Sequence, residues 1–308
     1  MRMWRPTLTE SMPIADDPLG ELLETLYLKQ AARTREDIFI GPSNFMPTGR
    51  VFGGQQLGQA LVAASRTVEP DRKVHSMHGY FLRGGKIDLP ITYSVDRIRD
   101  GKSFSTRRVQ AYQDGEPLFS SIYSFQVEEP GLEHQETLPD NIPDPESLPP
   151  LKELMEVMQD NPAAQYWAKG RPFDMRHIEK SIYFYIEGEH VAHQAIWFKT
   201  IGPLPDDPIL HNAALAYASD YSLLEPIYRR HGLVWSHPGL MVASLDHAMW
   251  FHRPARVDEW LLYVQDSPNA RGGRGLGLGK IFNRSGELVA TVAQEGLVRI
   301  PVEELANH

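Results

Sequence analysis

The chain has 308 residues, enough for one large or two ordinary domains, and its 42% hydrophobic content supports a substantial core. The net charge is −9 and no region is dominated by Lys and Arg, so nucleic acid is not an expected partner. There is no cysteine, which excludes disulfides, cysteine-based zinc sites and thiol nucleophiles. The first residues lack the apolar core of a secretory signal and no apolar run is long enough to span a membrane, so the expected location is the cytoplasm.

The first half of the chain is predicted to hold helices followed by strands. Apolar residues at helical spacing predict one helix that begins after Asp17 and a longer one over 51–68. Alternating apolar residues predict four strands, at 74–83, 90–98, 104–113 and 117–127. Asp-Gly pairs at 100–101 and 114–115 are typical of hairpin turns, so these strands are expected to form an antiparallel meander.

The same order of elements returns in the second half. An acidic, proline-rich stretch without periodicity, residues 128–150, separates the halves and is predicted to be a linker. A helix is expected over 151–168, and another opens at Asp207, a suitable N-cap, with Pro208 in its first turn. The strands predicted in this half are 181–187, 192–200, 240–251, 259–266, 272–284 and 287–299.

Sequence similarity between the halves indicates an internal duplication. The segment ALVAAS at 60–65 aligns with ALAYAS at 214–219, and YFLR at 80–83 aligns with WFHR at 250–253. Each copy is one long helix followed by an antiparallel meander, and a sheet wrapped around that helix buries the apolar faces of both. The expected fold class is therefore α+β, with two tandem units, each an antiparallel sheet around a long central helix. The expected boundaries are a flexible tail at 1–16, a first unit at 17–127, a linker and connecting helix at 128–168, and a second unit at 169–308.

Three polar side chains of the second copy fall on faces that are predicted to point inwards. Asp220 follows Tyr217 in a core-facing helical row, Ser244 shares an apolar strand face with Trp250, and Gln294 lies on an apolar face of the last strand. A buried polar group is unfavourable unless it is partnered, and each of these alone is more often structural than catalytic. Their occurrence in one copy suggests that they converge.

Other patterns do not support metal or phosphate chemistry. His190 and His193 lie near two glutamates but do not form the H-E-x-x-H arrangement, so no metal site is expected. The alternate glycines from Gly273 to Gly279 fit neither phosphate-loop pattern, and they predict a place where another backbone or a ligand tail approaches closely. The G-x-S-x-G elbow of serine hydrolases is absent from the sequence.

Seven segments resemble those of the type II acyl-CoA thioesterases, in register from about residue 20 to residue 300: VFGGQQLGQALVAA, VHSMHGYFLRGG, RDGKSFSTRRVQAYQDGEPLFSSIYSFQ, LAYASDYSLL, LDHAMWFHRP, DEWLLY and VATVAQEG. The resemblance implies the double hot-dog fold, which agrees with the duplication. It also implies hydrolysis of fatty acyl-CoA to free fatty acid and CoA without a cofactor. The implied catalytic trio is Asp220, Ser244 and Gln294. Ser244 stands where the best-known relatives have Thr, which keeps the hydroxyl but leaves χ1 less rigid.

The resemblance implies general-base catalysis, in which Asp220 accepts a proton from a water that Ser244 and Gln294 also hold. Direct attack by the carboxylate, giving an anhydride, remains an open alternative. The first copy has Arg66 where the second has Asp220, so the chemistry is expected in the second copy alone.

The expected partners are the acyl-CoA substrate and further copies of the chain, since hot-dog units pair into dimers or tetramers. Two other functions stay open: a hot-dog 3-hydroxyacyl-CoA dehydratase or hydratase, which typically uses a His–Asp pair, and a non-catalytic acyl-CoA binder. The cations considered for the CoA phosphates are Arg83, Arg99, Lys102, Arg107, Arg108, Arg271 and Arg274.

Overall fold

The computed structural model describes residues 16–33, 37–156, 162–183, 185–186 and 189–307. Within them, 13 strands form one antiparallel sheet in the order β1-β2-β4-β5-β6-β3-β10-β13-β12-β11-β8-β7, and β9 pairs with β13. The strands are β1 (Lys29–Arg33), β2 (Asp37–Gly41), β3 (Arg72–Phe81), β4 (Ile91–Asp100), β5 (Phe104–Gln113), β6 (Glu116–Val127), β7 (Phe173–His177), β8 (His193–Thr200), β9 (Met241–Ser244), β10 (Asp246–Phe251), β11 (Leu261–Arg271), β12 (Arg274–Asn283) and β13 (Leu288–Arg299).

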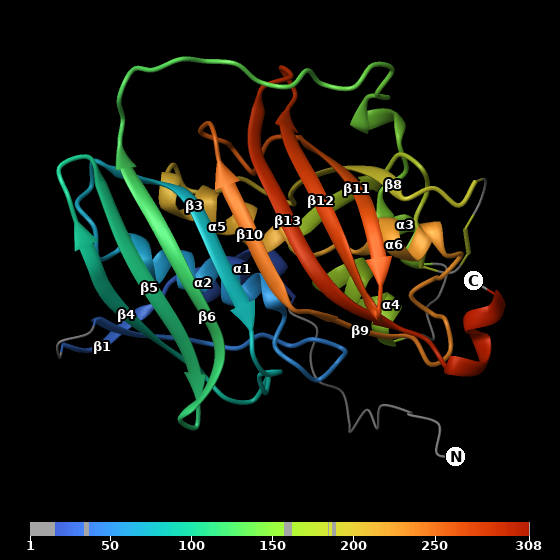
Figure 1. Ribbon diagram of the computed structural model, residues 1–308, viewed down its shortest axis with the longest axis horizontal. Helices are drawn as coiled ribbons and strands as arrows, with labels where there is room; N and C mark the ends of the chain where they lie inside the picture. Colours follow the sequence, from blue (N-terminus) through green and yellow to red (C-terminus); the bar gives the residue numbers. More distant parts are fainter. Residues whose placement is uncertain (1–15, 34–36, 157–161, 184, 187–188, 308) are drawn as a thin grey trace.

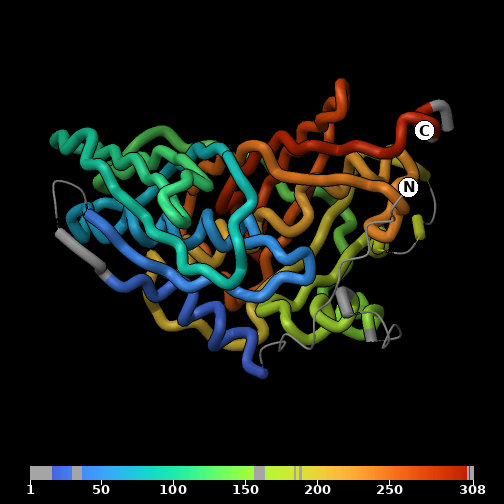
Figure 2. The backbone as a smooth tube through the Cα atoms, turned by 90° about the horizontal axis from the view of Figure 1, so that it is seen from below, coloured from blue at the N-terminus to red at the C-terminus, as the bar shows by residue number. Residues whose placement is uncertain are grey.

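Helices cover one face of this sheet. They are α1 (Pro18–Leu26), α2 (Gly53–Ser65), α3 (Leu151–Glu156), α4 (Pro162–Gln165), α5 (Pro208–Ser219) and α6 (Glu225–Arg230), with short helical turns η1 (Pro145–Ser147), η2 (Tyr166–Gly170) and η3 (Val302–Asn307). The helices lie behind the strands in Figure 1, and in Figure 2 the red strands of the last part of the chain and the blue α1 lie along opposite edges of the molecule. No helix within the described ranges is both long and apolar enough to cross a membrane.

The two halves of the chain share one sheet and one core. They join where β3 pairs antiparallel with β10, with Met77 opposite Met249. The largest cluster of buried apolar side chains includes Leu57 of α2, Leu215 of α5 and both of these methionines. Because removing this apolar surface from water is the main driving force for folding, the halves are expected to stabilise each other.

The central helices α2 and α5 pack antiparallel through glycines. A Cβ at Gly54 would lie 2.2 Å from the carbonyl oxygen of Tyr217, and one at Gly58 would lie 3.0 Å from that of Ala213. Both distances are too short for a side chain, so the two backbones touch here. The start of α2 therefore lies beside the end of α5.

Several expectations on the elements are confirmed. Asp207 caps α5 by accepting the backbone N–H of Ile209, with Pro208 at the first helical position. The β5 strand runs over the predicted residues, and the turn after it has positive φ at Asp114 and Gly115, as a tight hairpin requires.

The strand expected over 181–187 is wrong for the residues that the structure describes there; residues 184 and 187–188 lie outside them. The strand of this region is β7, which begins earlier, at Phe173. Ile182 is instead buried against α6, and its carbonyl accepts the backbone N–H of Trp235. The apolar stretch around Ile182, which has the composition of a strand, therefore lies in a loop that packs on a helix.

Two further expectations need correction. The helix expected over 151–168 is divided into α3, α4 and the turn η2, and residues 157–161 lie outside the described residues. The short strands β1 and β2 were not predicted, because β1 is mostly polar and each has only five residues.

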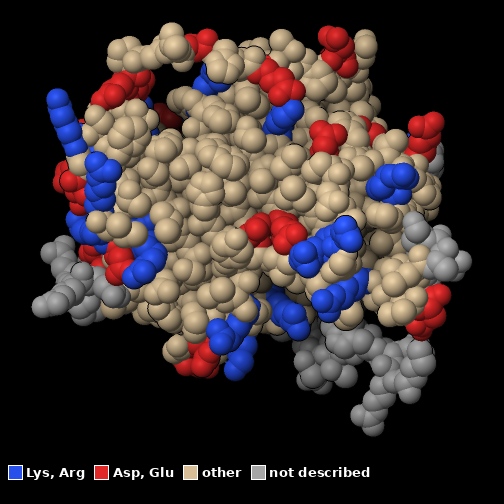
Figure 3. Space-filling view, in the orientation of Figure 1, with Lys and Arg blue, Asp and Glu red and all other residues tan. Residues whose placement is uncertain are grey.

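The outward face of the sheet carries exposed apolar side chains near the junction of the halves. Figure 3 shows few charged side chains in the middle of this face and more around its rim. We call the group formed by Tyr80, Ile122, Trp250 and Leu278 the outer apolar patch, and these side chains are 37–63% exposed. They lie on β3, β6, β10 and β12, so the patch crosses both halves.

Candidate active site

Asp220 lies at the C-terminal cap of α5, in contact with the start of α2. Its backbone has φ −86° and ψ −8°, and its side chain is partly buried. The carboxylate accepts a hydrogen bond from the backbone N–H of Gly54, and a Cβ at Gly53 would lie 2.6 Å from Oδ2. The C-terminus of its own helix disfavours a negative charge, whereas the N-terminus of α2 favours one. The antiparallel helix pair thus places the carboxylate against backbone donors of the other copy.

The first copy has a cation at the equivalent position. Arg66 is the C-cap of α2, as Asp220 is of α5, which agrees with the sequence alignment of the two copies. Its guanidinium lies 5.4 Å from the ring centroid of Tyr27 and hydrogen-bonds the carbonyl of Leu28. A cation at a helix C-terminus is favourable, so this residue has a structural explanation.

Ser244 lies at the end of β9, where the strand expected over 240–251 is interrupted. The register with β13 shifts by one residue at Leu245, between β9 and β10. The extra residue inverts the alternation of the faces, as a β-bulge does. The expectation that Ser244 shares a face with Trp250 is therefore wrong: Trp250 is 37% exposed on the outward face, whereas His247 is completely buried.

The structure brings the three predicted site residues together. The hydroxyl of Ser244 donates to Oδ1 of Asp220 over 3.1 Å, and Nε2 of Gln294 donates to Oγ of Ser244 over 2.9 Å. Gln294 is 1% exposed on the inward face of β13 and also hydrogen-bonds Asp220. The carboxylate thus faces a hydroxyl, an amide and a backbone N–H.

The pKa of Asp220 is raised to about 6. Burial is the main cause, since it disfavours the charged form, and the hydrogen bonds from Gln294, Ser244 and the Gly54 N–H partly oppose it. A carboxylate with such a pKa is ionised at neutral pH and is a stronger proton acceptor than an ordinary one.

His247 is a member of this site that the sequence analysis missed. Its Nδ1 lies 2.5 Å from Oε1 of Gln294, and its Nε2 lies 3.0 Å from Oγ of Ser219. Burial lowers its pKa to about 4, so the ring is neutral at neutral pH. The motif LDHAMWFH contains the residue, but its inward direction follows only from the bulge at Leu245.

The glycines of β12 let the segment after α5 and the helix α6 approach the sheet closely. A Cβ at Gly277 would lie 2.2 Å from the carbonyl oxygen of Leu223, and one at Gly275 would lie 2.5 Å from Cδ1 of Ile227. The prediction that these alternate glycines mark the close approach of another backbone is confirmed at Gly277, whereas Gly275 receives a side chain. The segment after Asp220 therefore rests directly on the sheet.

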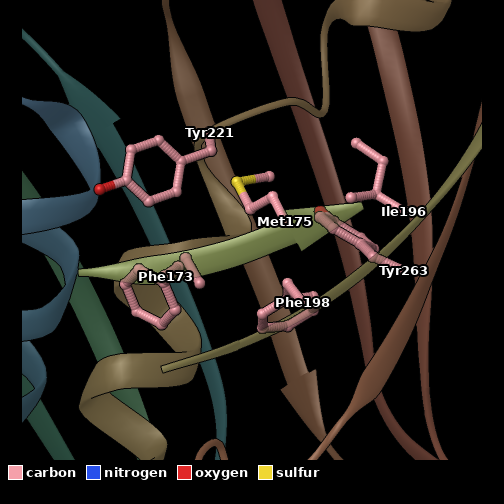
Figure 4. Close-up of a pocket in the computed structure, with 7 residues that line it drawn as sticks. Phe173, Met175, Ile196, Phe198, Tyr221 and Tyr263 are labelled. Carbon is pink, nitrogen blue, oxygen red and sulfur yellow. The ribbon is translucent and has the colours of Figure 1, made fainter. Parts of the chain in front are cut away.

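A closely packed apolar pocket, with no room for a water molecule, lies beside the end of α5. Figure 4 shows side chains of three strands and of this helix end around it. Its lining is Phe173, Met175, Ile196, Phe198, Ala218, Tyr221 and Tyr263. Ala218 and Tyr221 flank Asp220 in the chain, so the pocket adjoins the candidate site.

Not all the cations considered for phosphate binding are available. Arg107 is 1% exposed, and its guanidinium donates to the hydroxyl and carbonyl of Thr67 and to Asp100. Thr67 follows the C-terminal end of α2, whereas Asp220 faces the start of that helix. Arg107 is therefore excluded as a CoA-phosphate ligand. Arg83 is accessible and pairs with Glu116 at 3.3 Å.

Comparisons with known proteins agree with this fold and site. A family model described as acyl-CoA thioesterase matches residues 171–297, and one described as acyl-CoA thioesterase N-terminal domain matches residues 42–126. Acyl-coenzyme A thioesterase 8 of Homo sapiens is 37% identical, with 92% of each chain covered. Acyl-CoA thioesterase 2 of Haemophilus influenzae is 38% identical, with 92% of this chain and 98% of the relative covered.

Solved structures give the same result. The acyl-CoA thioesterase II TesB2 from Mycobacterium marinum has a TM-score of 0.74 and 44% identity, with 92% of this chain and 98% of that chain covered. A hot-dog protein from Alicyclobacillus acidocaldarius has a TM-score of 0.75 at 19% identity, with 92% of this chain and 99% of that chain covered, which supports the fold. The expected α+β double hot-dog fold is confirmed, and the chain belongs to the type II acyl-CoA thioesterase family.

Proposed function

We propose that this protein hydrolyses fatty acyl-CoA to free fatty acid and CoA, with water as the nucleophile. The observation that carries the proposal is that the side chains of Ser244 and Gln294 converge on the partly buried carboxylate of Asp220. The substrate class comes from the relatives, which are named as acyl-CoA thioesterases. The apolar side chains beside Asp220 are of the kind that contact an acyl chain.

In the proposed reaction, ionised Asp220 accepts one proton from a water that Ser244 and Gln294 orient. The water oxygen bonds to the thioester carbonyl carbon, and the negative charge moves to the carbonyl oxygen. Backbone N–H groups at the start of α2 stand close to Asp220 and are suited to stabilise this oxyanion. The carbon–sulfur bond then breaks, and the CoA thiolate takes the proton from Asp220.

Release of free thiol from palmitoyl-CoA tests the function. We expect the wild-type protein to release thiol, and Asp220→Asn to lower kcat at least about 100-fold because the amide cannot accept the proton. Binding of the substrate should survive, since the amide has nearly the same shape. Asp140→Asn, at an exposed position of the linker, is the matched control and should keep wild-type kcat.

The same assay separates the rival functions. A dehydratase or hydratase would change the acyl group without releasing thiol, and a non-catalytic binder would retain the acyl-CoA intact. Among the described residues, the histidine nearest to Asp220 in the hydrogen-bond network is His247, which reaches it through the side chain of Gln294. This arrangement differs from a direct His–Asp pair and favours hydrolysis.

A single turnover in H₂¹⁸O, with enzyme in excess over substrate, tests for an anhydride that opens by attack of water at its enzyme carbonyl. General-base attack places ¹⁸O in the fatty acid during the first turnover. Attack by the carboxylate would form an anhydride, and water attacking its enzyme carbonyl would leave ¹⁸O in Asp220. We expect the label in the fatty acid, and label in the peptide that contains Asp220 would contradict the general-base route.

A further inference from the structure

A continuous line of hydrogen bonds passes through His247 and ends at the candidate base. It begins at Oγ of Ser219, 3.0 Å from Nε2 of His247, and continues from Nδ1 to Oε1 of Gln294. From there Nε2 of Gln294 reaches Ser244 over 2.9 Å, and the hydroxyl of Ser244 reaches Asp220 over 3.1 Å. His247, Gln294 and Ser219 are almost completely buried, so no water competes for these bonds.

We propose that His247 is a positioning residue, which fixes the orientation of the Gln294 amide and thereby makes the Ser244 hydroxyl donate to Asp220. The inference rests on the proposed hydrolysis, because it concerns the base of that reaction. His247 does not touch the reacting atoms; it acts through two other side chains.

When Nε2 of Gln294 donates to Ser244, the chemistry of the groups sets the direction of the other bonds. An amide oxygen only accepts and an amide NH₂ only donates, so Oε1 of Gln294 then needs a ring nitrogen that carries hydrogen. The neutral ring of His247 has one N–H, which must then be Nδ1–H, and its Nε2 becomes an acceptor for the Ser219 hydroxyl in place of the carbonyl of Ala216. Gln294 is left to donate to Ser244, whose hydrogen is free to reach Asp220. Every bond points towards the carboxylate.

The other tautomer of His247 would reverse the line. With hydrogen on Nε2, the ring would donate to Ser219, whose own hydrogen has a second acceptor in the carbonyl of Ala216 at 2.8 Å. Nδ1 would require the NH₂ of Gln294, the amide would turn over, and Ser244 would donate to the amide oxygen. The oxygens of Ser244 and ionised Asp220 would then face each other without a hydrogen. The Nδ1–H tautomer is therefore the one that suits an ionised base.

The two ends of this line of hydrogen bonds are neighbours in the chain, so the peptide bond between them closes the line into a ring. Ser219 and Asp220 are consecutive residues at the end of α5, whereas His247 lies on β10, Gln294 on β13 and Ser244 on β9. The bonds thus fix the last turn of the helix against three strands. The ionisable groups that feel the charge of Asp220 from other elements are Tyr228 and Tyr263, and the pKa of each is raised well above its usual value, mainly by burial.

Two amide variants of the histidine test the proposal. The NH₂ of Asn stands near the position of Nδ1, whereas the NH₂ of Gln stands near that of Nε2. We therefore expect His247→Asn to keep the donor to Gln294 and to retain kcat within about threefold. His247→Gln should lower kcat at least about tenfold with KM changed less than about twofold, because orientation of the base is lost and substrate contacts are not.

The pH dependence of kcat/KM distinguishes a positioning role of His247 from a purely structural one. Loss of the Ser244 hydrogen bond removes a donor from the carboxylate and raises the pKa of Asp220. The acid limb of kcat/KM should therefore move to higher pH, by about one unit, in His247→Gln and stay in place in His247→Asn. His252→Gln, at an exposed histidine beyond the end of β10, is the matched control and should change neither kcat nor the limb.

The outcomes distinguish this proposal from the function on which it rests. If the wild-type protein releases no thiol from palmitoyl-CoA, the proposed function fails. If the wild-type protein is active and the Gln variant has the same kcat and acid limb, only the role of His247 is overturned. Equal losses of kcat in the Asn and Gln variants, matched by equal losses in melting temperature, would assign His247 a purely structural role and would also overturn the proposal.

Discussion

The position of Asp220 explains both its raised pKa and its ability to remain charged. Burial raises the pKa to about 6, and donors from three other segments keep it from rising further. One of these donors, the Gly54 N–H, belongs to the first copy of the repeat. A single residue of the second copy therefore depends on both copies for its chemistry.

The pH dependence of activity should report this carboxyl. Because the base must be ionised, kcat/KM should be constant above about pH 7 and fall tenfold per pH unit below the pKa of about 6. Initial rates of thiol release over pH 4.5–8.5, read by a method independent of pH such as chromatography of CoA, provide the measurement. An acid limb near the ordinary aspartate pKa of 3.8 would contradict the assignment.

The same shift predicts an effect on stability. The folded-state pKa of Asp220 lies above the value of 3.8 that is usual for the exposed group, so the folded state binds its proton more tightly. Ionisation therefore destabilises the fold, and this contribution grows as pH rises from about 4 to 6 and is constant above. The free energy of unfolding of Asp220→Asn, taken relative to that of wild type, should therefore be higher at pH 8 than at pH 4.

Urea unfolding at the two pH values measures the difference. The exposed substitution Asp140→Asn should show the same stability relative to wild type at both. A gain of Asp220→Asn that is larger at pH 4 than at pH 8 would reverse the sign and contradict the raised pKa.

Substitutions of Ser244 test whether the hydroxyl or its exact side chain matters. Thr keeps the hydroxyl and restricts χ1, so Ser244→Thr should retain kcat within a few fold. Ser244→Ala removes the donor to Asp220 and should lower kcat about 10- to 100-fold. Steady-state kinetics with palmitoyl-CoA compares the two, and equal activity of the Ala variant and wild type would remove Ser244 from the mechanism.

At the scale of elements, the contact between α2 and α5 sets the site. The absence of a side chain at Gly54 lets the helix backbone touch the carbonyl of Tyr217, which brings the start of α2 to the end of α5. The glycines of β12 do the same for the segment after Asp220. The helix that contacts Asp220 and the segment that follows Asp220 are thus both held in place at glycines, where a Cβ has no room.

We therefore expect Gly54→Ala to separate the helices. The added methyl would lie 2.2 Å from a backbone oxygen, and the resulting shift should cost about 2 kcal/mol of unfolding free energy and lower kcat together with it. Urea denaturation and thiol release measure the two effects. Gly131→Ala is the control, because a Cβ there meets open space. An unchanged unfolding free energy in Gly54→Ala would show that the helices can adjust.

The elements that the sequence predicted well are those marked by residues within the element itself, such as a helix cap or an alternating strand pattern. Asp207 and Pro208 mark the start of α5 by side-chain and backbone chemistry within one turn, and the alternation in 104–113 matches β5. The strand expected at 181–187 failed because an apolar stretch such as that around Ile182 can pack in a loop on a helix as well as in a sheet. The bulge at Leu245 was not predicted either, since one extra residue in a strand changes neither its composition nor its length noticeably.

At the scale of the whole molecule, the outer apolar patch lies across the junction of the halves, on the face opposite the helices. Exposed apolar residues gathered in a broad, mainly uncharged area of a face are typical of contact surfaces (Figure 3). We predict that two copies associate through this face, since a two-fold axis would let the same patch serve both.

Light scattering after size exclusion should then give a mass of at least twice 34.9 kDa. Trp250→Glu would place a charge in the patch and should shift the protein towards the monomer. Lys102→Glu, which alters an exposed residue in the turn between β4 and β5, away from the patch, should leave the mass unchanged. A monomeric wild-type protein would contradict the prediction of an oligomer.

The sequence by itself indicated the duplication and, through its resemblance to the type II acyl-CoA thioesterases, the double hot-dog fold and the three polar residues, because repeats and family motifs are visible within short windows of the chain. Only the tertiary structure decided that the carboxylate of Asp220 meets the start of α2, that His247 and not Ala248 faces inwards, and that Arg107 is buried away from the site. These facts depend on contacts between residues far apart in the chain and on strand register. A single bulge changes which side chains point inwards, and a single helix contact brings a backbone donor of the first copy to the carboxylate of the second.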